Sequence, residues 1–136
     1  MSMRGALSGR RVLLVEDEVM VAWALQDMLT DIGCTVIGPA GRAVHAMVLI
    51  DVETIDAAVL DINLGGETSY LVADLLAARG VPFVFSTGYD QDGLIPAYRA
   101  FPTLQKPYQH SELARTLGAL FVPKAPRFDP FMAAVM

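Results

Sequence analysis

The chain has 136 residues, of which 54% are apolar and 18% charged, and its net charge is −5. This length suits one ordinary globular domain. No basic cluster extends beyond Arg10-Arg11, which argues against nucleic-acid binding, and no apolar run approaches the ~20 residues that span a bilayer. The single Cys34 suits a reducing compartment, where it would act as a small buried hydrophobe. We therefore expect a cytoplasmic domain that binds neither nucleic acid nor membrane.

The first half of the chain alternates short apolar runs with helical patterns. Residues 11–15 form an apolar run that ends in the acidic trio 16–18. A helical face follows and stops at Gly33; it consists of Val21, Leu25, Met28, Leu29 and Ile32. Residues 35–39 are typical of a second strand with a turn after it, and a second helix is expected from about 41 to 51.

The second half repeats the alternation. Strands are expected at 57–61, 81–87 and 103–105. The helices between and after them are indicated by Val72, Leu75 and Leu76, and by Leu113, Leu117 and Leu120. Regular alternation of strand and helix predicts an α/β fold, in which a parallel sheet carries helices on both faces.

Polar residues follow the apolar runs at four of the expected strand ends. Glu16 and Asp17 follow the first strand and Asp61 ends the third. Thr87 ends the fourth strand, and Lys106 follows the fifth. The carboxyl ends of parallel strands lie along one edge of the sheet, where open α/β folds place their sites, so we expect these five residues to converge.

This set of residues suits phosphoryl transfer. Three carboxylates brought together repel each other unless a cation lies among them, and Mg²⁺ with oxygen ligands is the usual solution beside phosphate. The backbone carbonyl of Asn63 could supply a further oxygen. Asp61 could attack phosphorus, while Lys106 and the Thr87 hydroxyl neutralise the phosphoryl oxygens. Gly88 has no side chain to block the phosphodonor.

The same residues resemble the receiver domains of two-component response regulators. Val12-Leu13-Leu14-Val15-Glu16-Asp17-Glu18 resembles the acidic motif after the first strand of that family, and Ala58-Val59-Leu60-Asp61-Ile62-Asn63-Leu64 its phosphoacceptor strand. Thr87 and Lys106-Pro107 match its switch hydroxyl and its lysine. The resemblance covers residues 10–121. It implies a flavodoxin-like (CheY-like) sheet of strand order 2-1-3-4-5, Mg²⁺ as the cofactor, and a sensor histidine kinase or phosphotransfer protein as the phosphodonor.

A subgroup marked by the string Phe-Ala-Thr-Gly-Tyr is more similar still. The string reads Phe85-Ser86-Thr87-Gly88-Tyr89 here, with Ser in place of Ala, and Asn63-Leu64-Gly65-Gly66 and Leu104-Gln105-Lys106-Pro107 also fit. The resemblance implies that Asn63, Gly88 and Tyr89 tune access to the acyl phosphate and its hydrolysis.

The chain departs from typical receivers between the fourth and fifth strands. Pro102, Thr103 and Leu104 occupy the positions where the usual switch aromatic stands. Only 19 positions separate Thr87 from Lys106, and Gly and Pro are frequent among them. We therefore predict a short or irregular fourth helix and a switch by ordering of residues 88–102.

Three functions remain open from the sequence. The first is a receiver domain at 9–122 with a tail at 123–136 and no output domain. It would signal to a downstream protein target or act as a phosphate sink. The second is a pseudo-receiver that binds proteins without phosphorylation. The third is a phosphohydrolase with an aspartyl nucleophile, which Asn63 disfavours because such enzymes have a second Asp there. The tail would be mobile, or would dock on the sheet edge or on a second protomer in a homodimer.

Overall fold

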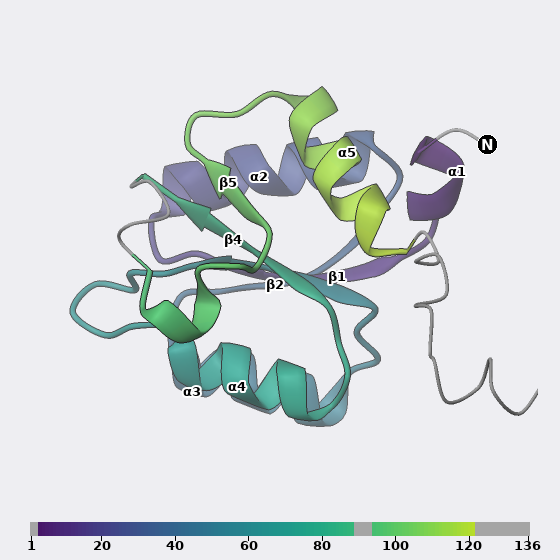
Figure 1. The fold of residues 1–136 in the computed structure, drawn as a ribbon. Helices are drawn as coiled ribbons and strands as arrows, with labels where there is room; N and C mark the ends of the chain where they lie inside the picture. Colours follow the sequence, from purple (N-terminus) through teal and green to yellow (C-terminus); the bar gives the residue numbers. More distant parts are fainter. Residues whose placement is uncertain (1–2, 89–93, 122–136) are drawn as a thin grey trace, which may run out of the picture.

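The computed structural model describes residues 3–88 and 94–121, and these form a parallel sheet with helices on both faces (Figure 1). The strands are β1 (Arg11–Val15), β2 (Thr35–Ala40), β3 (Ala57–Asp61), β4 (Phe83–Thr87) and β5 (Thr103–Gln105). They lie in the order β2-β1-β3-β4-β5, and every neighbouring pair is parallel. The predicted flavodoxin-like fold and its strand order are confirmed.

The helices divide between the two faces of the sheet. They are α1 (Met3–Leu7), α2 (Val19–Asp31), α3 (Ala43–Val52), α4 (Tyr70–Ala78), α5 (His110–Leu120) and the short 3-10 helix η2 (Pro96–Tyr98). Figure 1 shows α2 and α5 on one face and α3 and α4 on the other. This arrangement buries both faces of the central strands, which explains why those strands are continuous apolar runs.

Alternation along the strands separates the core into two layers. Val12 and Leu14 of β1 pack with α2 and α5, whereas Leu13 and Val15 pack with α3 and α4. All four side chains are fully buried. Leu7 of α1 is also fully buried in the layer of α2 and α5. Sequence reasoning did not predict α1, because five residues are too short to show a helical period.

Several element ends differ from the prediction by one or two residues. β4 begins at Phe83 rather than at residue 81, β2 extends to Ala40, and α3 begins at Ala43. Such shifts are expected, since periodicity fixes an element better than its ends. The domain limits 9–122 and the tail 123–136 stay predictions, and the tail lies outside the described residues.

The connection from β4 to β5 is short and irregular, as predicted for its described part. Between residues 94 and 102 the only helix is η2, Pro96–Tyr98. Aromatic rings take the place of a longer helix against the sheet. Tyr98 is 7% exposed and packs edge-on to Phe85 at a centroid distance of 5.4 Å, and it stacks on Tyr70 at 5.8 Å. Phe101 completes this cluster on the face of α3 and α4, 4.9 Å from Tyr98.

Candidate functional site

The carboxyl edge of the sheet brings together the acidic residues that the sequence singles out. Glu16 and Asp17 follow β1, and Asp61 ends the neighbouring strand β3. One oxygen from each carboxylate lies within 4.8 Å of the others. The predicted convergence of these three side chains is therefore observed. It arises because β1 and β3 are adjacent parallel strands that end at the same edge.

Lys106 is the residue directly after β5, and its side chain extends into this cluster. Its Nζ lies 2.5 Å from Oε1 of Glu16 and 3.5 Å from Oδ2 of Asp61. Burial alone would lower the pKa of Lys106, but the hydrogen bond to Glu16 and the charges of both carboxylates outweigh it, so the pKa is raised. The ammonium is thus held in its charged form beside Asp61.

Glu16 lies beneath the site rather than at its opening. The residue is 2% exposed, and its Oε2 accepts the backbone N–H of Glu18 at 3.3 Å. Burial raises the pKa of Glu16, the neighbouring Asp61 raises it further, and Lys106 opposes both. Glu16 therefore anchors Lys106 from below, while Asp17 and Asp61 face the opening.

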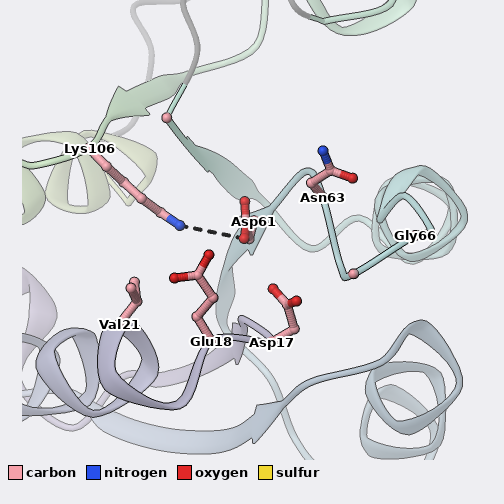
Figure 2. A pocket seen from close by; sticks show the side chains of 9 residues that line it. Asp17, Glu18, Val21, Asp61, Asn63, Gly66 and Lys106 are labelled. Carbon is pink, nitrogen blue, oxygen red and sulfur yellow. Dashed lines mark ion pairs between the residues drawn. The ribbon is translucent and has the colours of Figure 1, made fainter.

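A cavity of about 550 Å³ opens above Asp61. It is lined by Asp17, Glu18, Val21, Asp61, Asn63, Gly65, Gly66, Gly88 and Lys106. Figure 2 shows Asp17 and Glu18 pointing into the same space as Asp61, with Lys106 opposite and the Asn63 amide turned away. Sequence reasoning did not assign Glu18 to the site. Its place directly after Asp17, at the start of α2, is the signal that could have found it.

The loop after β3 approaches Asp17 closely. Gly65 has a φ of +63°, and a Cβ on it would lie 3.1 Å from Oδ2 of Asp17. A side chain at this position would both strain the backbone and crowd the carboxylate. The sequence marked Gly65 only as part of the resemblance, so its contact with Asp17 is new.

Thr87 lies on the other side of Asp61. It is 1% exposed and lines a second cavity, of about 290 Å³, together with Asp61, Asn63 and Gly88. Gly88 borders both cavities, and within the described residues, its chain neighbours aside, no atom lies within 4 Å of where its Cβ would be. The open mouth expected at Gly88 stays a prediction. Tyr89, predicted to tune hydrolysis, lies outside the described residues.

The donor set fits a hard divalent cation. Asp17 and Asp61 present carboxylate oxygens to the larger cavity, and Glu16 lies behind them. All of these are oxygen donors, which suit Mg²⁺, and no His or Cys belongs to the cluster among the described residues. A cation here would also relieve the repulsion between neighbouring carboxylates.

The fold and the site define a doubly wound α/β protein with an acidic pocket and a lysine at the carboxyl ends of its strands. Residues 12–117 match the family described as the response regulator receiver domain. The chain therefore belongs to that family, as its sequence motifs predict.

Relatives with solved structures have the same fold. The chain is 42% identical to SdrG from Sphingomonas melonis Fr1, with a TM-score of 0.75 over 90% of this chain and 100% of SdrG. It is 28% identical to the receiver domain of the PhyR response regulator from Erythrobacter litoralis, with a TM-score of 0.75 over 90% of this chain and 98% of that domain.

A curated relative is longer than this chain. The transcriptional regulatory protein PdtaR of Mycobacterium tuberculosis is 30% identical over 108 residues, which cover 76% of this chain and 53% of PdtaR. The chain thus spans about half the length of this relative. Among the described residues, no helix combines the length and apolar character needed to cross a membrane.

Proposed function

We propose that this receiver domain accepts a phosphoryl group on Asp61 and signals through the change of state that follows. The observation that carries the proposal is the placement of Asp61 at the floor of the larger cavity, with Lys106 Nζ 3.5 Å from its Oδ2. A carboxylate in this position can be reached by a donor, and the lysine can neutralise the charge that arrives with the phosphoryl group.

The transfer is a displacement at phosphorus. An Asp61 carboxylate oxygen forms a bond to the phosphorus, and the bond to the donor breaks: P–N in a phosphohistidine, P–O in acetyl phosphate. The electron pair of that bond leaves with the imidazole or the acetate. The product is an aspartyl phosphate, which water later hydrolyses to return the carboxylate.

Each residue around Asp61 has a role in this proposal. Asp17 and Asp61, with Glu16 behind them, would hold Mg²⁺, and the backbone carbonyl of Asn63 would add a further oxygen. A bound Mg²⁺ would neutralise part of the phosphoryl charge and orient the group for attack. Lys106 would bind a second phosphoryl oxygen as a point charge.

The remaining predicted residues govern access and readout. Thr87 would donate its hydroxyl to the phosphoryl group from the side of the second cavity. Gly88 has no side chain that would obstruct the donor on its way to Asp61. Asn63, two residues after Asp61, and Tyr89, two residues after Thr87, would set how readily water reaches the aspartyl phosphate.

The partners follow from the family. A sensor histidine kinase or a phosphotransfer protein would supply the phosphoryl group in the cytoplasm, and a protein target would recognise the phosphorylated form. Draining phosphate from a kinase is the alternative outcome of the same chemistry. A beryllofluoride-activated conformation of SdrG has been solved, which supports the use of this mimic on the present chain. Enzymatic activity would be limited to self-phosphorylation and autodephosphorylation.

Intact-mass spectrometry after incubation with acetyl phosphate and Mg²⁺ tests the proposal. We expect a single gain of ~80 Da, the mass of one phosphoryl group on one nucleophile. The gain should disappear in Asp61→Asn and when EDTA removes Mg²⁺. An unmodified wild-type protein would instead favour a pseudo-receiver that binds partners without phosphorylation.

A further inference from the structure

A hydrogen bond to a buried serine lies next to the site and takes no part in the proposed phosphoryl transfer. Ser86 of β4 is fully buried, and its Oγ lies 2.9 Å from the hydroxyl oxygen of Tyr108. Ser86 pairs in register with Asp61 on β3, so the two side chains stand beside each other on the same face of the sheet. Tyr108 follows Lys106 by two residues and packs against the core layer of α2 and α5.

A second bond also attaches the Lys106 segment to β4. The backbone N–H of Lys106 donates to the carbonyl oxygen of Thr87 at 2.7 Å. Two residues later, the Tyr108 hydroxyl bonds to Ser86, the residue before Thr87. The short chain from Lys106 to Tyr108 is therefore fixed at both ends to the last two residues of β4. The ammonium that contacts Asp61 extends from this fixed segment.

We propose that Tyr108 is a positioning residue for Lys106, acting through its hydrogen bond to the buried Ser86 hydroxyl beside Asp61. The bond holds the Lys106 segment at the distance from β4 at which the ammonium bridges Glu16 and Asp61. This inference rests on the proposed phosphoryl transfer to Asp61. It adds that the Ser in place of Ala within the Phe85–Tyr89 string has a role here: it forms the partner of Tyr108.

A double-mutant cycle separates positioning from a purely structural role. The variants are Tyr108→Phe, Ser86→Ala and the double variant, and Thr30→Val is the control. It also removes one hydroxyl, which donates to the carbonyl oxygen of Gln26 within α2. Three quantities are measured for each protein: the rate of mass gain with acetyl phosphate and Mg²⁺, the melting temperature, and amide hydrogen exchange at Lys106.

If Tyr108 positions Lys106, the melting temperature and the phosphorylation rate should respond differently to these substitutions. Tyr108→Phe should lower the melting temperature, because it leaves the Ser86 hydroxyl buried without its partner, and should slow phosphorylation about tenfold. The double variant removes both hydroxyls, so its melting temperature should return toward the wild-type value while phosphorylation stays slow. The Lys106 amide should exchange faster in all three variants. Thr30→Val should keep the phosphorylation rate within about twofold.

Two results would overturn the inference. One is a wild-type phosphorylation rate in both Tyr108→Phe and Ser86→Ala. The other is a double variant that recovers rate and melting temperature together, which would make the bond structural only. If Tyr108→Phe does not fold, the Ser86→Ala variant alone tests the inference, since it breaks the same bond and leaves the Tyr108 ring in place. Failure of the proposed function is distinct: the wild-type protein would then gain no phosphoryl group.

Discussion

The Lys106 ammonium lies 2.5 Å from Oε1 of Glu16, whose side chain is fully buried, and from there it also contacts Asp61. One cation thus offsets two of the three carboxylates at the carboxyl edge of the sheet. Asp17 forms no ion pair with any residue in 3–88 or 94–121. Without a metal ion, the site therefore holds more negative than positive charge. Removing a carboxylate charge and removing the lysine charge should then have opposite effects on stability.

Asp17→Asn should stabilise the metal-free protein, whereas Lys106→Gln should destabilise it. The first relieves carboxylate repulsion, and we expect a gain of about 1 kcal/mol in the free energy of unfolding. The second leaves Glu16 and Asp61 facing each other without their cation, and we expect a loss of about 2 kcal/mol. Urea unfolding in EDTA measures both changes.

The response to added Mg²⁺ provides a control for this prediction. Mg²⁺ should raise the unfolding free energy of the wild-type protein and have little effect on Asp17→Asn, because a ligand for the ion is lost. Equal destabilisation by both substitutions in EDTA would show that the acidic cluster does not lack positive charge, and would contradict this account of the site.

Gly65→Ala should weaken Mg²⁺ binding. Its methyl group would lie 3.1 Å from Oδ2 of Asp17, at a residue whose φ is +63°. We expect a loss of about 1–2 kcal/mol in stability from the backbone conformation and a Mg²⁺ affinity that falls about tenfold as Asp17 is displaced. Isothermal titration with Mg²⁺ measures the affinity. Gly66→Ala is the matched control, since its φ is also positive but no atom of the described part of the chain, its neighbours aside, lies within 4 Å of the added Cβ. Equal affinities in the two variants would rule out the contact with Asp17 as the cause.

Cys34 should make stability fall at alkaline pH. Burial raises the pKa of this thiol from 9.0 to about 11, so between these values the unfolded chain ionises while the folded protein holds a neutral thiol. Folding then loses stability as pH rises through that window, by up to about 2 kcal/mol from this group. Denaturant unfolding at pH 8 and pH 10.5 measures the change. Cys34→Ala should show a smaller decline, and an identical decline would place the pH dependence elsewhere.

The aromatic cluster between β4 and β5 indicates which segment should change its dynamics on phosphorylation. Tyr98 bonds to Asp74, and the Tyr70 hydroxyl accepts the backbone N–H of Ile95 at 3.2 Å, so this segment is attached to α4 at two points. We expect amide exchange across residues 94–102 to slow on binding of beryllofluoride and Mg²⁺, as predicted for a switch by ordering. Unchanged exchange in this segment, together with slower exchange elsewhere, would assign the switch to another surface.

The sequence predicts the fold well because each central strand contains an apolar run and most of the longer helices show their period. The convergence of Glu16, Asp17 and Asp61 follows from strand order alone, since neighbouring parallel strands end at one edge. Sequence reasoning could not predict that Glu16 lies beneath the cavity and bonds to Lys106, because side-chain depth depends on packing. Sequence reasoning also missed the Ser86–Tyr108 bond, since the two residues are 22 positions apart and Ser86 stood out only as a departure from the Ala of the motif.

The central claim is that Asp61 is the side chain that accepts phosphorus. Borohydride reduction of the phosphorylated protein, followed by peptide sequencing, tests it most directly, because reduction converts an aspartyl phosphate into homoserine and marks the modified residue. We predict homoserine at position 61 alone, dependent on Mg²⁺ and on acetyl phosphate. Homoserine at Asp17, or a phosphorylated protein that still has aspartate at position 61 after reduction, would contradict the account.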